Sequence, residues 1–234
     1  MELTVNNIAR MLDISEVKAD STENDIRKMA KLAIKYNCIA CFAMPSYTTL
    51  IVDLLKNSPQ INVGGVVGFP SGANTTLAKV AEAHEMIEMG CNELDMVINI
   101  GRLKSGDLSY VYEDIAAVVK AAGNLPVKVI LECHYLTNDE IKTACQLGAK
   151  AGVSFIKTGT GWASTGATSD NIELINSCVG AEVEIKAAGG VRDLDTLLDL
   201  HKLGATRFGV GQKSATLILQ EMEQRENEFI HHSL

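Results

Sequence analysis

The chain has little positive charge, and it lacks a long apolar run. Its 234 residues carry 21 Lys and Arg against 29 Asp and Glu, a formal net charge of -8. An acidic chain lacks the broad positive field that nucleic-acid binding needs, and an anionic membrane surface repels it. The chain has no run of about 18 apolar residues, so we expect no membrane span. Residues 1–4 lack the basic and then apolar pattern of a secretion signal. We therefore expect neither a nucleic-acid nor a membrane partner.

Sequence motifs for metals and nucleotides are also missing. The chain contains no HExxH, EF-hand, P-loop or GxSxG pattern, so we expect no metal ion and no cofactor. Its six cysteines lie mostly in apolar runs, and the one CxxC, Cys38 to Cys41, has no second pair and no nearby histidine. Three residues apart on a strand, two side chains point to opposite faces. We interpret the cysteines as reduced thiols in a core, which is typical of a cytoplasmic protein.

Short apolar runs alternate with longer segments of helical period along the chain. A possible first strand lies near Met11–Ile14, and the other candidates are Ile39–Ala43, Asn62–Val67, Glu93–Ile98, Val127–Leu131, Phe155–Lys157, Glu184–Ala187 and Arg207–Val210. Runs without clean polar alternation are typical of strands buried on both faces of a parallel sheet. Their spacing of roughly 20–35 residues is that of βαβ units.

Eight such units predict an α/β fold, a TIM (β/α)8 barrel, as a single domain over residues 1–234. The alternative is a doubly wound open sheet. The barrel is favoured because no GxGxxG follows the first strands and no linker-like tract divides the chain. Residues 220–234 form a charged, polar tail, which we expect to be partly mobile.

Several residues mark the expected helices. The segment Thr75–Gly90 has helical period, and its predicted apolar stripe consists of Leu77, Val80, Ala81, His84 and Ile87. Thr137 and Glu140 form a capping box that predicts the start of another helix. Glycines stand where helices are expected to end, namely Gly90, Gly123, Gly148 and Gly204.

Charged residues stand at or near the carboxyl ends of four predicted strands, and they are Asp95, Glu132, Lys157 and Lys186. Catalytic groups of TIM barrels lie at this end. Lys157 and Lys186 come from neighbouring strands, which lie about 4.8 Å apart in a sheet. Burial and mutual repulsion lower the pKa of such an ammonium, and a neutral amine is then available as a nucleophile.

Asp95 supplies the counter-charge for these lysines. It lies inside an apolar strand, where a carboxylate is costly unless it is paired. A structural network that only neutralises itself is one interpretation, but two lysines on adjacent strands with an inward aspartate favour a functional site. Without a metal or redox motif, this combination favours carbonyl chemistry through a Schiff base.

Glycine-rich loops follow the last strands, where TIM barrels bind phosphate. In chain order they contain Gly159, Gly161, Gly189, Gly190, Arg192, Gly209 and Gly211. Glycine lets backbone N–H groups approach an anion, although it is common in such turns for conformational reasons alone. Together the loops predict a phosphate-bearing substrate. Among the histidines, His134 follows a strand and could approach the site, whereas His84 lies on a predicted helix.

Four segments, in the same order, resemble the deoxyribose-phosphate aldolases, and they are Val66–Thr76, Asn92–Asp107, Val153–Gly161 and Lys186–Arg192. The resemblance runs from about Met11 to about Ala215. It implies a metal-independent class I aldolase in a TIM barrel. The implied reaction is the reversible cleavage of 2-deoxy-D-ribose 5-phosphate to acetaldehyde and D-glyceraldehyde 3-phosphate. The resemblance also implies a homo-oligomer, of which a homodimer is the simplest.

By position, the resemblance implies a role for each charged residue. Lys157 corresponds to the Schiff-base lysine and Lys186 to the second lysine that perturbs it. Asp95 corresponds to the acid that, with water, moves protons, and Asp13 falls at the family's N-terminal aspartate. For binding of the substrate phosphate, the candidates are Gly161, Gly189, Gly190, Arg192, Gly209 and Gly211.

Several positions depart from the family's pattern. The family's Asp-His-Thr is Asp13–Ser15 here, and Met44 replaces an asparagine. Gly159 replaces a serine, Trp162 brings a bulky ring after the glycine loop, and Gly211–Gln212 replaces two serines. The lysine and acid machinery is intact, whereas the groups that choose the substrate differ. The alternatives are therefore a Schiff-base aldolase for another sugar phosphate or keto compound, and a barrel that binds a sugar phosphate without turnover.

Overall fold

Strands and helices alternate along the chain. The structure, a computed structural model, describes residues 4–232 and the side chains of residues 4–228. The strands are β1 (Leu12–Glu16), β2 (Ala40–Ala43), β3 (Asn62–Val67), β4 (Glu93–Val97), β5 (Val127–Ile130), β6 (Phe155–Lys157), β7 (Glu184–Ala188) and β8 (Ala205–Gly211). The α-helices are α1 (Val5–Ala9), α2 (Glu23–Tyr36), α3 (Thr48–Leu55), α4 (Thr76–Glu88), α5 (Ile100–Lys104), α6 (Leu108–Ala122), α7 (Asn138–Ala151), α8 (Ser169–Cys178), α9 (Leu194–Lys202) and α10 (Gln212–His232), with 3-10 turns η1 (Pro45–Tyr47) and η2 (Cys133–Tyr135).

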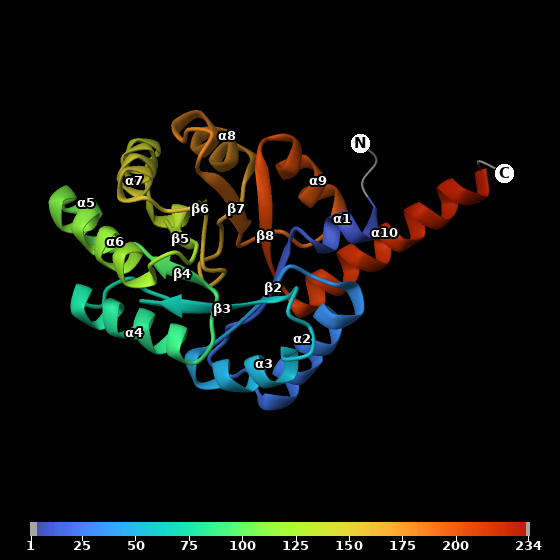
Figure 1. Cartoon of the computed structure of the whole chain (residues 1–234). Coiled ribbons are helices and arrows are strands. Elements are labelled where there is room, and N and C mark those ends of the chain that lie inside the picture. The colour runs from blue at the N-terminus through green and yellow to red at the C-terminus, as the bar shows by residue number, and fades with distance from the viewer. Residues whose placement is uncertain (1–3, 233–234) are drawn as a thin grey trace.

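The strands close into one parallel barrel, because β8 pairs with β1 as well as with β7. Figure 1 shows the helices around the outside, with α1 beside α10. The predicted TIM barrel is confirmed, and the open-sheet alternative is wrong. In the register, Lys157 pairs with Ile130 on one side and with Lys186 on the other. The carboxyl ends of β5, β6 and β7 therefore meet at one rim.

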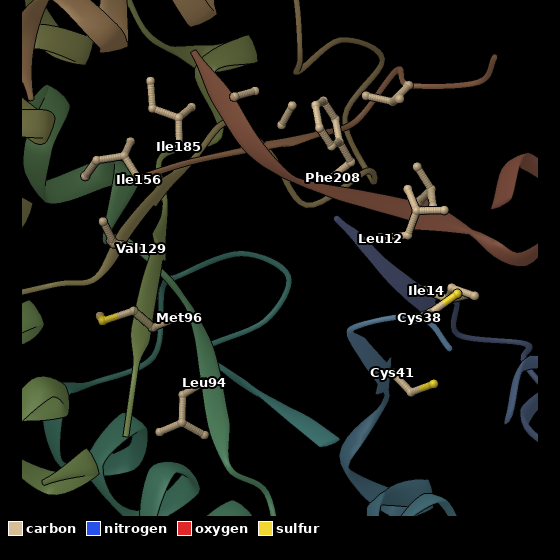
Figure 2. Packing of buried hydrophobic residues seen from close by; sticks show 14 of the residues in the cluster. Leu12, Ile14, Cys38, Cys41, Leu94, Met96, Val129, Ile156, Ile185 and Phe208 are labelled. Atoms are coloured by element: carbon tan, nitrogen blue, oxygen red, sulfur yellow. The ribbon is translucent and has the colours of Figure 1, made fainter. Parts of the chain in front are cut away.

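The two faces of each strand have different partners. On β4, Leu94 and Met96 belong to the large apolar core that packs the barrel against its helices, as Figure 2 shows. Glu93 and Asp95, which alternate with them, pair with charged groups of β5, β6 and β8. Alternation along a strand thus places apolar side chains outside the barrel and charged side chains inside it.

The capping box that predicts the start of α7 is confirmed, but its end is not where the sequence predicts it. The Thr137 hydroxyl accepts the Glu140 N–H, and the Glu140 carboxylate accepts the Thr137 N–H. Gly148 lies inside the helix, which ends at Gly152 with a φ of 85°. A Cβ at Gly148 would lie 2.9 Å from Ile156 Cδ1, so this glycine allows α7 to approach the barrel closely.

The predicted apolar stripe of α4 is also wrong. Leu77 is 83% exposed, and the buried face consists of Lys79, Ala83 and Met86. Lys79 can be buried because its Nζ lies 2.5 Å from Asp114 Oδ2 on α6. The segment is a helix, as its period predicts. Its buried face differs from the predicted stripe because a paired lysine, Lys79, takes a buried position that the pattern reserves for an apolar residue.

The expected polar tail is helical through His232, as part of α10. Its charged residues have partners on other helices: Arg225 pairs with Asp195 in the first turn of α9, and the Glu226 carboxylate accepts the Val5 N–H at the start of α1. These contacts explain why a polar segment continues as a helix here; residues 233–234 lie outside the described residues. None of the described helices has the length and apolar character needed to cross a bilayer.

Candidate active site

Charged side chains fill the barrel interior. We define the interior charge cluster as seven buried residues from six strands, and they are Asp13 on β1, Glu93 and Asp95 on β4, Lys128 on β5, Lys157 on β6, Lys186 on β7 and Arg207 on β8. Isolated charges are very costly inside a protein, so such a cluster requires that its members pair with one another. The structure pairs every one of them.

Asp95 lies at the centre of the cluster. Lys157 Nζ donates a hydrogen bond to Asp95 Oδ2 at 2.7 Å, and Lys186 Nζ donates to the same oxygen at 2.6 Å. Lys128 Nζ lies 3.2 Å from the other oxygen, Oδ1. Burial acts to raise the pKa of Asp95, but the ammonium groups of Lys128, Lys157 and Lys186 hold it well below its usual range. Asp95 is therefore a carboxylate at neutral pH.

A lower layer of the cluster fixes Asp13 under Lys186. Arg207 Nη2 lies 2.6 Å from Asp13 Oδ1 and 2.9 Å from Glu93 Oε1. Asp13 presents its second oxygen, Oδ2, to Lys186 Nζ at 2.5 Å. Burial acts to raise the pKa of Asp13, but Lys186 and Arg207 lower it overall. Asp13, which the sequence suggested only by resemblance, thus contacts Lys186 directly.

The ammonium form of Lys186 predominates at pH 7, but its pKa lies close to the working pH. Burial lowers the pKa of Lys186 to about 8, and Lys157 and Lys128 act in the same direction, while Asp13 and Asp95 oppose the change. Groups with a pKa close to the working pH are the most effective general acids and bases. The pair formed by Lys157 and Lys186 therefore holds an exchangeable proton next to a permanent carboxylate.

A cavity of about 710 Å³ opens at the carboxyl end of the barrel. Lys157 lines it, whereas Lys186, Asp95 and Asp13 lie beneath the lining residues. The cavity is also lined by all six candidate phosphate residues, namely Gly161, Gly189, Gly190, Arg192, Gly209 and Gly211. Three further lysines that the sequence did not single out, Lys18, Lys28 and Lys213, add positive charge to its lining.

Glu132 supports the loop after β6 instead of joining the lysines. It adopts a left-handed backbone conformation with a φ of 55°, and its carboxylate accepts the Thr160 N–H at 3.2 Å and the Thr160 hydroxyl. A Cβ on Gly159 would lie 2.8 Å from Glu132 Oε1. The departure from serine to glycine at residue 159 therefore leaves room for Glu132 to hold this loop.

Trp162 forms one wall of the cavity mouth. Its indole Nε1 donates a hydrogen bond to the Val17 carbonyl at 2.9 Å, and its ring meets Phe69 edge to face, with centroids 6.2 Å apart. These contacts connect the loops that follow β6, β1 and β3. Neither contact follows from local sequence patterns, because the partners are far apart in the chain.

Neither His134 nor His84 belongs to the cavity lining. His134 Nδ1 lies 2.8 Å from Thr165 Oγ1 on the surface, and His84 is exposed on α4. Within the part of the chain that the structure describes, no group of three or more His, Cys, Asp or Glu side chains has the arrangement of a metal site.

Known proteins are similar to this chain both in sequence and in structure. Residues 9–212 match the family model described as DeoC/LacD family aldolase. A deoxyribose-phosphate aldolase of Klebsiella pneumoniae subsp. pneumoniae is 43% identical over 98% of this chain and 93% of its own length. The solved structure of "QR15, an Aldolase" has a TM-score of 0.88 and 32% identity over 94% of this chain and 97% of its own. The tetrameric deoxyribose phosphate aldolase from Aeropyrum pernix has a TM-score of 0.85 and 26% identity over 94% of this chain and 92% of its own.

Proposed function

The chain belongs to the DeoC/LacD aldolase family, and on that basis we propose that it is a class I aldolase that cleaves 2-deoxy-D-ribose 5-phosphate. The products are acetaldehyde and D-glyceraldehyde 3-phosphate, and the reaction is reversible. The single observation that carries the mechanism is the buried trio in which Lys157 and Lys186 donate to one oxygen of Asp95. Relatives such as the Klebsiella pneumoniae aldolase support the substrate.

Lys157 is the nucleophile. The interior charge cluster contains four cationic side chains and three carboxylates, so the loss of one proton balances its charge. Lys157 contacts one carboxylate, whereas Lys186 contacts two, and Lys157 alone of the two lines the cavity. Lys157 is therefore the lysine that a sugar aldehyde in the cavity reaches. Its neutral amine then adds to the sugar aldehyde.

The reaction proceeds through a lysine iminium. The amine of Lys157 forms a C–N bond to C1 of the open-chain sugar, and loss of water gives the iminium. The C3 hydroxyl loses its proton, the C2–C3 bond breaks, and its electron pair moves toward the iminium to give an enamine. Glyceraldehyde 3-phosphate leaves, C2 of the enamine takes up a proton, and hydrolysis releases acetaldehyde and the free amine.

Asp95, with water, moves the protons of these steps, and Lys186 keeps the proton balance of the site. A carboxylate between two amines exchanges protons with either one without a change in the net charge of the cluster. Asp13 holds Lys186 in place from below. Lys186 acts through Asp95, because its Nζ donates to the same carboxylate oxygen as Lys157.

The substrate phosphate binds at the glycine-rich rim. Gly190 has a φ of 123°, a conformation open to glycine, and together with Gly189, Gly209 and Gly211 it offers backbone N–H groups without side chains in front of them. The start of α10 follows directly after β8 and adds the positive end of a helix dipole. Arg192 supplies a charged, bidentate donor in the same cavity.

The second candidate function is that of a related aldolase for a different sugar phosphate or keto compound. Trp162 favours this candidate, because its indole lines the cavity mouth at a position where the family pattern has no bulky ring. A panel of phosphorylated, unphosphorylated and branched sugars separates the two by kcat/KM. A barrel that only binds the sugar phosphate would show binding with no turnover.

Lys157→Leu is expected to abolish turnover while the fold remains intact; full turnover in this variant would overturn the proposal.

Two broader features belong to the same proposal. The protein forms homo-oligomers, which is supported by the tetramer of the Aeropyrum pernix relative and by Leu77, which is 83% exposed on α4. Sedimentation equilibrium measures the oligomeric state directly, and a homodimer is the simplest expected state.

A reducing, cytoplasmic location is supported by the six cysteines, all of them free thiols.

A further inference from the structure

The ring of Phe42 lies among the amines of the interior charge cluster. Phe42 is on β2 and only 2% exposed, and its ring centroid is 4.1 Å from Lys186 Nζ. The same centroid is 5.2 Å from Lys128 Nζ and 5.9 Å from Lys157 Nζ. An aromatic ring therefore takes a place inside the barrel that faces the lysine pair, and it is closer to Lys186 than to Lys157.

A glycine on the next strand makes room for this ring. A Cβ at Gly64 on β3 would lie 2.0 Å from Phe42 Cε1, so no other residue at position 64 is compatible with the ring where it stands. Ala40 and Val66 complete the small apolar cluster inside the barrel. The combination of Phe42 with Gly64 holds the ring in one place relative to the amines.

The ring distinguishes the two lysines electrostatically. The face of a phenyl ring is negative and attracts a cation within about 6 Å, and the attraction is strongest where water is excluded. Lys157 lies at the edge of this range, and Lys186 lies well inside it. A positive charge on Lys186 is therefore stabilised more by the ring than a positive charge on Lys157.

Charged side chains from five other strands also surround Lys186. Asp13 on β1 and Asp95 on β4 attract its ammonium, while Lys128 on β5 and Lys157 on β6 repel it. Arg207 on β8 is its register partner, and the charge of Arg207 is directed to Asp13 and Glu93. The ring thus adds a favourable interaction with the ammonium of Lys186 to those of Asp13 and Asp95.

We propose that Phe42 keeps the shared positive charge of the lysine pair on Lys186, and thereby leaves Lys157 as the neutral amine that attacks the sugar aldehyde. Phe42 is a positioning residue that acts through Lys186. This inference rests on the proposed function, since it presupposes an imine at Lys157. Without the ring, the two amines compete more evenly for the proton, and part of the protein carries the neutral amine on the wrong lysine.

The test changes the charge of the ring face while its shape stays nearly the same. Mono-, di- and trifluorinated phenylalanine are incorporated at position 42, and the pH profile of kcat/KM is measured with 2-deoxy-D-ribose 5-phosphate. Because fluorine withdraws negative charge from the ring face, the ammonium of Lys186 loses stabilisation and its proton leaves at a lower pH. The alkaline limb of the profile is expected to move to lower pH stepwise, by about one unit for the trifluorinated ring, which is a tenfold change in proton affinity.

A second readout follows the position of the neutral amine. Borohydride trapping with acetaldehyde is expected to modify Lys157 in the native protein, and the yield of this adduct at a fixed short time is expected to fall as fluorines are added, because a growing fraction of Lys157 is then protonated. Phe42→Leu, which retains apolar bulk without a ring, should move the alkaline limb in the same direction. The control places the same three fluorinated residues at Phe208, which is buried among the apolar residues outside the barrel; its alkaline limb should not move.

The outcomes separate the two proposals. If fluorination at position 42 lowers kcat/KM equally at every pH and leaves the alkaline limb in place, the ring only fills space and the role of Phe42 is overturned, while the aldolase mechanism stands. If the native protein gives no adduct at Lys157, the proposed function is overturned, and the inference about Phe42 is overturned with it.

Discussion

Lys157 and Lys186 are register partners on neighbouring strands, and both amines donate to one oxygen, Oδ2 of Asp95. Two ammonium groups so close together repel each other, so the arrangement favours the loss of one proton. Of these two lysines, Lys157 is the one that lines the cavity. This difference is why we propose that Lys157 is the nucleophile and that Lys186 keeps the proton.

Replacement of Asp95 removes the carboxylate that joins the two amines. Asp95→Asn is expected to lower kcat by about 10²- to 10⁴-fold, because a positioned acid–base group contributes this much to proton transfer. Some imine should still form, and borohydride trapping measures it. Unchanged turnover in Asp95→Asn would show that another group moves the protons.

The same carboxylates make the fold sensitive to acid. The pKa values of Asp13 and Asp95 lie below the ordinary 3.8, so their charged forms contribute stability that is present above that value and is lost as the pH falls through the lower folded values. Thermal melts from pH 6 to pH 2 should show a steep loss of stability below about pH 4. Asp95→Asn, less stable at neutral pH, should lose less over this range. Parallel curves for the two proteins would contradict this assignment.

Gly159 is expected to tolerate no side chain. In Gly159→Ala the added methyl would lie 2.8 Å from Glu132 Oε1 and 3.3 Å from the Ala188 carbonyl, which displaces the loop that directly follows Lys157. A loss of about 10- to 100-fold in kcat/KM is expected, since small misplacements of catalytic groups have effects of this size. Gly101→Ala is the matched control, because its nearest atom would be 3.8 Å away. Equal kinetics in both variants would rule out this role of Glu132.

Arg192 should matter only for substrates that carry phosphate. Arg192→Ala is expected to raise the KM for deoxyribose 5-phosphate by about 10- to 100-fold, which corresponds to the loss of one charged hydrogen-bonding group. The kinetic constants for unphosphorylated deoxyribose should change little. The control is Arg102→Ala, which removes a surface arginine paired with Asp107. If Arg192→Ala affects both sugars equally, the phosphate lies elsewhere.

Much of the fold could be predicted because parallel strands are buried on both faces. Runs such as Asn62–Val67 therefore have no polar alternation, and their regular spacing predicts the barrel. The positions of Lys157 and Lys186 at strand ends indicated the site for the same reason. The predicted helix end at Gly148 is wrong, because this glycine instead allows α7 to approach strand residues that are distant in the sequence.

The remaining parts of the site depend on contacts across the barrel. Arg207 and Glu93 lie in strands where a charged residue by itself suggests exposure, and only the closed register brings them together. Phe42 gave no signal in the sequence because its inward ring requires Gly64 on the next strand. Trp162 could be noted as bulky, but its bond to the Val17 carbonyl joins loops that are far apart in the chain.

The most direct test of the account is to trap the covalent intermediate. The protein is incubated with deoxyribose 5-phosphate and borohydride, digested, and the modified lysine is identified by mass spectrometry. A stable adduct is expected on Lys157, and no adduct is expected in Lys157→Leu. An adduct on Lys186 in the native protein, or no adduct with any aldehyde, would contradict it.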